Sequence, residues 1–221
     1  MPPHSFVRDN FRLVLVTDGR GDVPRLERIV TAAVAAGVRC VQLREPQLPA
    51  RGVMQACERL LPLLDGAHGT LLVNDRLDVV AAGFAHGAQV GHRALPPEIA
   101  RRVIGPGHCL GYSAHDAGEL DLAVASGCDF ALLSPVWTTS SKPGAPHLGV
   151  ARAAHLTARA RLPVVWLGGV DLLRVTELRE VPPNHRPVGF AVRSAIMAAE
   201  DPAEATGALL RALAAVGFPA A

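Results

Sequence analysis

The chain has 221 residues, of which 49% are hydrophobic, and its formal net charge is +2. This length is enough for one large domain with a sizeable core, and the hydrophobic content excludes a disordered chain. The 22 basic residues are scattered and aromatic residues make up only 4%, so no nucleic-acid partner is expected. We also expect no membrane partner and no secretory signal, because the sequence shows neither a long apolar span nor an apolar signal core.

The four cysteines show no C-x-x-C spacing. Cys40, Cys109 and Cys128 fall in or beside apolar strands, where a cysteine usually serves as a small buried hydrophobic residue. We therefore expect reduced thiols and a cytoplasmic protein.

Short apolar runs alternate with Ala-, Leu- and Arg-rich stretches along the whole chain. The apolar runs predict strands over residues 12–17, 38–44, 70–74, 88–90, 109–113, 130–134, 163–167 and 188–192. The intervening stretches predict helices, among them residues 24–36, 49–64, 116–126, 150–160 and 201–215. Residues 182–187 are polar and rich in proline, which indicates a loop before the last strand.

Alternation of this kind implies a parallel sheet with crossover helices. Eight such units in this length predict a (β/α)₈ TIM barrel. The rival fold is a doubly wound open sheet, which normally needs fewer strands, and no G-x-G-x-x-G follows the first strand. Because no Pro/Gly/Ser-rich linker divides the chain, we expect a single domain over residues 1–221, with its core over about 12–213.

One strand ends in an unusual polar group, Asn74, Asp75 and Arg76, directly after the buried run at 70–73. The carboxyl ends of strands are where barrels and open α/β sheets place their chemistry. Asp75 is a suitable ligand for Mg²⁺, which prefers carboxylate oxygens and substrate phosphates. The alternative is that Asp75 caps a helix that begins near Leu77.

Other strand ends carry similar side chains, which favours chemistry over capping. Arg44 and Lys142 can neutralise anionic oxygens, the first as a bidentate fork and the second as a point charge. This assortment suits a phosphorylated or diphosphorylated small molecule. The polar residues at or after the predicted strand ends include Thr17, Asp18, Gln42, Arg44, Glu45, Ser113, His115, Thr138, Thr139, Ser140, Ser141, Lys142, Arg193 and Ser194.

A glycine pair, Gly168-Gly169, follows the seventh predicted strand, and Arg193-Ser194 follows the eighth. Barrel phosphates often bind between these two loops, on backbone N–H groups at a helix start. The alternative is that two tight turns need glycine. The combination of both loops favours phosphate binding.

Together these segments resemble the thiamin phosphate synthase/TenI superfamily. The motifs, in chain order, are Q-L-R-E (42–45), V-N-D-R (73–76), G-Y-S-A-H (111–115), S-P-V-W-T-T-S-S-K (134–142), L-G-G-V (167–170) and G-F-A-V-R-S-A-I (189–196). The resemblance spans about residues 12–213 and implies a (β/α)₈ barrel. Its synthases join hydroxymethylpyrimidine diphosphate to a thiazole phosphate with Mg²⁺ and release diphosphate.

The resemblance implies a role for each matching residue. Arg44, Asn74 and Lys142 would contact the diphosphate, and Asp75 would be one magnesium ligand. Ser113 would lie near the pyrimidine or the diphosphate. The remaining expected substrate- and phosphate-binding residues are Gln42, Thr139, Ser141, Gly168, Gly169, Arg193 and Ser194.

Two departures from the synthase pattern remove charge from the expected site. Pro46 stands where the synthases carry a lysine, and Ala94 stands where they carry the second magnesium-binding aspartate. Arg93 lies beside that missing carboxylate. A charge-assisted contact contributes about 1.5–3 kcal/mol, so losing two could cost several orders of magnitude in rate or affinity.

The tautomerase branch of the superfamily uses a histidine just after the sixth strand, and this chain has Pro135 there. Histidines expected near the rim that could substitute are His86, His92, His115 and His147. Three functions stay open: a synthase-like transferase, which we favour, a TenI-like thiazole tautomerase, and a degenerate barrel that binds thiazole phosphate or thiamin phosphate. A homo-oligomer is compatible with all three.

Overall fold

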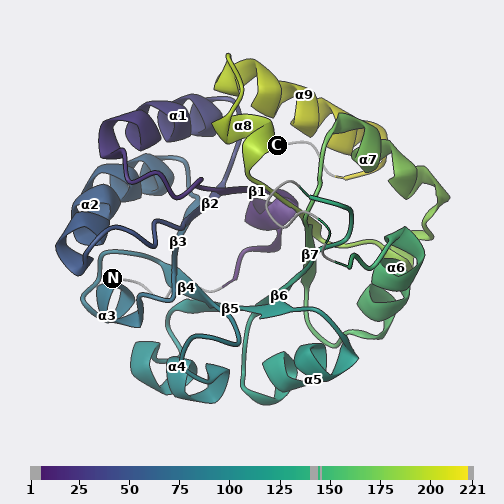
Figure 1. Cartoon of the computed structure of the whole chain (residues 1–221), viewed down its shortest axis with the longest axis horizontal. Helices are drawn as coiled ribbons and strands as arrows, with labels where there is room; N and C mark the ends of the chain where they lie inside the picture. Colours follow the sequence, from purple (N-terminus) through teal and green to yellow (C-terminus); the bar gives the residue numbers. More distant parts are fainter. Residues whose placement is uncertain (1–5, 140–143, 145, 219–221) are drawn as a thin grey trace.

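The computed structural model describes residues 6–139, 144 and 146–218. Eight parallel strands form a closed barrel in which each strand pairs with its neighbours in chain order and β8 pairs with β1 (Figure 1). The predicted TIM barrel is confirmed. The predicted bounds of β3 are those observed, and the other seven strands differ by one or two residues at one or both ends. The strands are β1 Leu13–Val16, β2 Cys40–Leu43, β3 Thr70–Asn74, β4 Gly87–Val90, β5 Cys109–Ala114, β6 Phe130–Leu133, β7 Val164–Leu167 and β8 Gly189–Val192.

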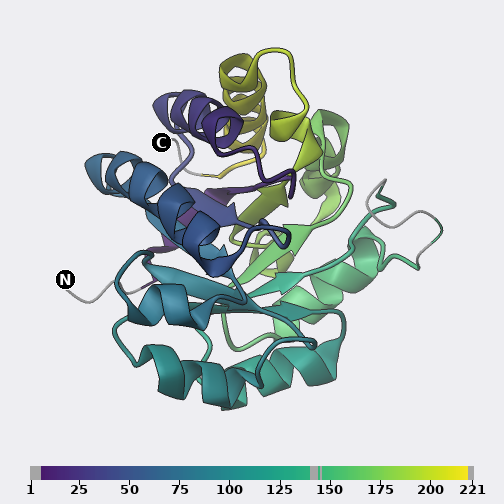
Figure 2. The same cartoon turned by 60° about the vertical axis from the view of Figure 1, so that its left-hand side comes forward.

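The helices form a ring outside the strands (Figures 1 and 2). All five predicted helices are present, and four helices begin at an aspartate whose carboxylate accepts backbone N–H bonds: Asp22, Asp116, Asp171 and Asp201. This capping satisfies N–H groups that the first helical turn leaves without partners. The α-helices are α1 Val23–Ala35, α2 Ala50–Gly66, α3 Leu77–Ala81, α4 Pro97–Ile104, α5 Ala117–Ala125, α6 Val150–Arg159, α7 Leu172–Thr176, α8 Ser194–Met197 and α9 Pro202–Ala215.

Short 3₁₀ helices complete the fold: η1 Arg8–Arg12, η2 Glu177–Glu180 and η3 Pro183–His185. The segment before β8 was predicted as a loop, and η3 is a single turn within it. Among the residues that the structure describes, none of the helices is both long and apolar enough to cross a membrane.

Strand alternation divides the buried side chains into two cores. Successive side chains of a strand point to opposite faces of the sheet. Leu15, Val73 and Trp166 belong to the larger core, which lies between the strands and the helices. Val14 and Leu72 belong to the smaller core, which fills the barrel interior.

Aromatic rings fill the amino-terminal end of the barrel. The ring of Phe11, in η1, lies 4.5 Å from both Phe6 and Phe130, measured between ring centroids. Figure 1 shows η1, in purple, inside the ring of strands in projection. Phe11 and Phe130 are fully buried, so this end of the barrel is closed by a hydrophobic floor.

The same alternation makes the opposite end of the interior polar. Cys40 and Leu72 point into the barrel, so Gln42 and Asn74, two residues further along β2 and β3, share their face. Gln89 of β4 is also buried. A carboxamide layer therefore lies above the hydrophobic floor at the carboxyl ends of β2 to β4.

The four cysteines are free thiols, as expected, and Cys40, Cys57 and Cys109 are buried. Burial raises the pKa of Cys57 and of Cys128 to about 12. These thiols therefore stay protonated at neutral pH and are poor nucleophiles.

Gly111 of β5 tests how tightly the interior is packed. A Cβ atom at this position would lie 2.1 Å from Gln89 Oε1 and 2.2 Å from the Phe130 ring. We predict that Gly111→Ala destabilises the protein by about 1–3 kcal/mol, the usual effect of overpacking a core. Chemical denaturation measures this change. The control is Gly66→Ala in α2, where a Cβ meets nothing within 4 Å, and the helix gains up to about 1 kcal/mol. Equal stability of the two variants would contradict the packing described.

Candidate active site at the carboxyl ends of the strands

Three predicted site residues form one hydrogen-bonded chain at the ends of β2 and β3. The Gln42 amide donates to Asn74 Oδ1 at 3.1 Å, and the Asn74 amide donates to Asp75 Oδ2 at 2.7 Å. Gln42 is buried, Asn74 is half-buried and Asp75 is exposed. These two hydrogen bonds therefore lead from the barrel interior to the rim and hold the Asp75 carboxylate in a fixed direction.

The backbone of Asp75 adopts the left-handed conformation, with a φ of 59°. Few residues other than glycine adopt this conformation readily, although Asp and Asn tolerate it best. Its N–H donates to Gln89 O at 3.0 Å, which ties the turn after β3 to β4. Asp75 does not cap α3, because the N-cap residue is Arg76 and no side chain caps that helix. The carboxylate thus remains directed toward the rim.

Opposing influences act on the Asp75 carboxyl group. Desolvation is the largest and raises its pKa above the ordinary value. The Asn74 hydrogen bond and the positive charges of Arg44 and Arg93 act in the opposite direction. Arg44 follows β2 and Arg93 follows β4, so the strands on both sides of β3 supply a guanidinium group whose charge acts on Asp75.

Ser113 of β5 is joined to the neighbouring strand β4 through Gln89. Its hydroxyl accepts a hydrogen bond from the Gln89 amide at 3.0 Å. Gln89 is 1% exposed, and its Oε1 atom is buried without a hydrogen-bond partner among the described residues. Sequence reasoning did not assign Gln89 to the site. The signal that could have found it is its position, directly opposite Asn74 in the register of β3 and β4.

Glu45 was noted in the sequence without a role, and the structure gives it one. Its two carboxylate oxygens accept the N–H groups of Gly19 and Gly21 at 3.1 and 2.6 Å. The adjacent Arg44 N–H donates to Thr17 Oγ1 at 2.8 Å. Glu45 therefore holds the loop after β1 against the end of β2, which positions Arg44.

Asp18 and Arg25 connect the first and last units of the barrel. Arg25 donates to Asp18 Oδ2 at 3.0 Å and also to the carbonyl oxygen of Met197 in α8. Arg20 pairs with the same carboxylate at 3.2 Å. Arg25 was not singled out from the sequence, because its partner Met197 is 172 residues away.

The glycine pair packs against the loop that follows β6. Gly168 and Gly169 have φ values of 103° and 70°, which favour glycine. A Cβ at Gly169 would lie 2.2 Å from the carbonyl oxygen of Thr138, and the Gly168 carbonyl accepts the Trp137 N–H at 3.1 Å. Close backbone approach is thus one reason for both glycines, and phosphate binding stays a prediction.

Among the described residues, three other predicted phosphate-binding residues lie at the end of this loop's described part or after β8. Arg193 is half-buried and Ser194 is exposed at the start of α8. Thr139 is half-buried at the end of the described segment. The predicted Ser141 and Lys142 lie outside the described residues.

The prediction that His86 lies near the rim was wrong. His86 precedes β4 at the opposite end of the barrel, is fully buried, accepts the Leu71 N–H at its Nδ1 atom and pairs with Asp65 at 2.8 Å. His92 and His115 do lie at the rim, with ring centroids 6.3 Å apart. His115 bonds Glu119 at 2.8 Å, and His147 is exposed.

Most carboxylates near the rim already have cationic or N–H partners. Asp18 pairs with two arginines, Glu45 binds two backbone N–H groups and Asp78 pairs with Arg76. Within the described ranges there is no cluster of three or more His, Cys, Asp or Glu side chains that could hold a metal. Asp75 is therefore the rim carboxylate best placed to bind a cation, and it needs oxygens from a ligand to complete the coordination.

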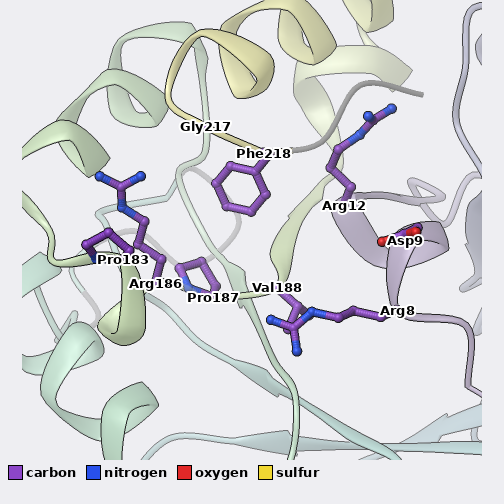
Figure 3. Close-up of a pocket in the computed structure, with 9 residues that line it drawn as sticks. All are labelled: Arg8, Asp9, Arg12, Pro183, Arg186, Pro187, Val188, Gly217 and Phe218. Carbon is purple, nitrogen blue, oxygen red and sulfur yellow. The ribbon is translucent and has the colours of Figure 1, made fainter.

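A cavity of about 180 Å³ lies at the other end of the barrel, between η1, the segment before β8 and the residues after α9. Figure 3 shows three arginines around it, Arg8, Arg12 and Arg186, whose guanidinium groups point in different directions. Arg186 donates to the carbonyl oxygens of Val181 and Val216. These groups do not converge on one point, and none of the predicted site residues lines this cavity.

Comparison with known proteins decides the family. The family model described as thiamine monophosphate synthase matches residues 13–196, which include all eight strands. The chain belongs to the thiamine monophosphate synthase family. The predicted superfamily is confirmed.

Named relatives of this family resemble the chain over most of its length. It is 38% identical to a thiamine-phosphate synthase of Laribacter hongkongensis, with 88% of this chain and 90% of the relative covered. It is 36% identical to a thiamine-phosphate synthase of Roseiflexus sp., with 88% and 82% covered. The structure of a thiamine phosphate pyrophosphorylase from Pyrococcus furiosus superposes with a TM-score of 0.83 at 28% identity, covering 95% of this chain and 98% of the other.

The raised pKa of Asp75 predicts that its negative charge destabilises the folded protein. The penalty is fully present at pH values above the raised pKa and disappears below the ordinary pKa, where the folded and unfolded states both bind the proton. We therefore predict that Asp75→Asn melts at a higher temperature than the parent at pH 7, and that the difference disappears near pH 3. Asn also tolerates the left-handed backbone. Melting curves at several pH values measure this, and a parent that is the more stable at pH 7 would contradict it.

Proposed function

We propose that this protein is a thiamine-phosphate synthase, a transferase that joins hydroxymethylpyrimidine diphosphate to a thiazole phosphate and releases diphosphate. The observation that carries the proposal is the rim assembly of Gln42, Asn74 and Asp75 beside Arg44 and Ser113. The family match over residues 13–196 supports it. The partners are phosphorylated small molecules, and the reduced cysteines support a cytoplasmic location.

In this proposal, the rim charges stabilise the departing diphosphate. Negative charge grows on the leaving oxygens as the bond to the pyrimidine methyl carbon breaks, so positive groups placed beforehand accelerate that step. Arg44 supplies a bidentate cation. The Asn74 amide, held between Gln42 and Asp75, would contact the same departing diphosphate. Lys142 belongs to the proposed set through the family motif.

The second substrate is proposed to bind across the barrel, near β7 and β8. Its phosphate would contact backbone N–H groups near Gly169 and Ser194, together with Arg193 and Thr139. Ser141 belongs to the proposed set through the family motif. The pyrimidine would lie lower, against Gln42 and Ser113. The thiazole nitrogen would then capture the pyrimidine-methyl cation that forms when the diphosphate leaves.

Magnesium fits this site in part. Asp75 offers one oriented carboxylate, and Ala94 offers no second one, so substrate oxygens and waters would supply the other ligands. When bound, the ion would neutralise charge on the diphosphate. Two arginine charges already act on Asp75, which disfavours a cation there unless an anionic ligand binds as well.

The alternative functions have less support. A TenI-like tautomerase needs a proton-shuttling histidine after β6, and Pro135 stands there. A degenerate barrel that binds thiazole phosphate or thiamin phosphate is favoured by Pro46 and Ala94, which remove a cation and a carboxylate from the synthase pattern. The retained Asn74, Asp75 and glycine pair favour the synthase.

The deciding experiment is a thiamin phosphate assay with both substrates and Mg²⁺. We predict slow turnover by the parent protein and a gain of about ten- to a hundredfold with Pro46→Lys, because a new cation contributes about 1.5–3 kcal/mol near the leaving group. Ala94→Asp alone should give less, since Arg93 pairs with the new carboxylate. The double variant should exceed the sum of the single changes, because both act on one metal–diphosphate unit. No product above background from the parent and from the folded double variant would reject the synthase in favour of a binding role.

A second prediction concerns magnesium itself. We expect weak binding of Mg²⁺ to the free protein and tighter binding once inorganic diphosphate is present, because Asp75 alone supplies the protein's carboxylate. Asp75→Ala should abolish the magnesium-dependent part of diphosphate binding. Isothermal titration calorimetry measures both. Tight magnesium binding without diphosphate, or an undiminished response in Asp75→Ala, would contradict the prediction.

A further inference from the structure

Arginines near the rim fall into two groups. Arg20 and Arg25 pair with Asp18, and Arg76 pairs with Asp78. By contrast, neither Arg44 nor Arg93 has a side-chain hydrogen bond or ion pair with any of the described residues. An arginine whose side chain forms no hydrogen bond or ion pair, near a candidate phosphate site, is available for an anionic ligand.

The loop after β4 carries Arg93 and begins beside a predicted site residue. The backbone folds into a turn in which the Ala94 N–H donates to the Gly91 carbonyl at 2.9 Å. A Cβ at Gly91 would lie 3.5 Å from the Ser113 Cβ, so the start of this loop contacts a predicted site residue. His92, the next residue, faces His115 at 6.3 Å between ring centroids.

The strand that leads into this loop is bonded to Asp75. The Asp75 N–H bonds the carbonyl of Gln89, in β4, which joins the turn after β3 to the strand that leads into the Arg93 loop. The charge of Arg93 also acts on the Asp75 carboxyl group, as does the charge of Arg44. Arg93 is exposed, so its guanidinium can meet a ligand from solvent.

We infer that Arg93 binds the diphosphate group directly. Its positive charge takes the place of the charge that a metal ion, held by the missing second carboxylate, would otherwise bring to the diphosphate. Arg93 stands beside Ala94, the position of the missing acid, and Pro46 removes a cation on the β2 side. A guanidinium in this loop offers a bidentate contact to phosphate oxygens. The inference rests on the proposed function, because it assigns a residue to the leaving group of that reaction.

A consequence is that diphosphate binding depends less on magnesium than a site with two carboxylates would. Two carboxylates repel a diphosphate until a cation bridges them, whereas Arg44 and Arg93 attract it without one. A guanidinium group attracts phosphate oxygens through its own charge, so this attraction does not require a metal to be loaded first.

The test is calorimetric titration of the full chain with inorganic diphosphate, in EDTA and then with Mg²⁺. In EDTA, the parent should bind diphosphate, and Arg93→Ala should bind it at least about tenfold more weakly, the usual loss of a charge-assisted contact. Arg93→Lys should recover part of the affinity, as a point charge without the fork. The control is Arg102→Ala, which removes the same charge from an exposed position on α4 and should leave the affinity within about twofold.

A charge swap makes the test sharper. In Arg93→Ala/Ala94→Asp, binding in EDTA should stay weak, while Mg²⁺ should restore it, because the new carboxylate can join Asp75 around the ion. The parent should gain much less from Mg²⁺. Undetectable binding by the parent in EDTA, equal affinity of the parent and Arg93→Ala, or a loss in Arg102→Ala as large as in Arg93→Ala would overturn the inference.

These outcomes are separate from those of the thiamin phosphate assay. Arg93-dependent diphosphate binding without any thiamin phosphate formation would reject the synthase and leave a diphosphate site that uses Arg93. Thiamin phosphate formation with diphosphate affinity unchanged in Arg93→Ala would support the synthase and reject the role of Arg93.

Discussion

Closure of the eight-stranded sheet is the constraint on which the rest of the structure depends. Because every strand pairs on both sides, each side chain must point either into the barrel or toward the helices. The apolar residues divide accordingly into an outer and an inner core. The inner face then determines where polar groups can lie, and Gln42, Asn74 and Gln89 stand where that face reaches solvent at one end.

The fold could be predicted from the sequence because strand and helix alternate with clear boundaries. The position of Asn74 and Asp75 could be predicted for the same reason, since a polar group that ends an apolar run lies at a strand end. The capping alternative for Asp75 could be excluded only from the structure, in which Arg76 is the N-cap residue of α3 and no side chain caps that helix. The sequence thus predicted that Asn74 and Asp75 lie at the carboxyl end of β3, while their part in a site stays a prediction.

Residues that act through distant partners were harder to predict. Glu45, after β2, accepts the N–H groups of Gly19 and Gly21 in the loop after β1. Arg25 donates a hydrogen bond to Met197 in α8, near the other end of the sequence. The prediction for His86 was wrong because this residue lies close in sequence to the rim residues after β4, while the strand itself separates His86 from them in space. A strand of four residues carries the chain from one end of the barrel to the other, so neighbours in a motif can lie at opposite ends.

The aromatic floor has a kinetic meaning. Phe6, Phe11 and Phe130 close the amino-terminal end, so a ligand can reach Gln42 and Asn74 only from the carboxyl ends of the strands. In the proposed reaction, whatever rests deepest against Gln42 and Ser113 must enter before the molecule above it and leave after it. The closed amino-terminal end therefore favours an ordered sequence of substrate arrival and product departure in the proposed reaction, because both substrates would use the same end of the barrel.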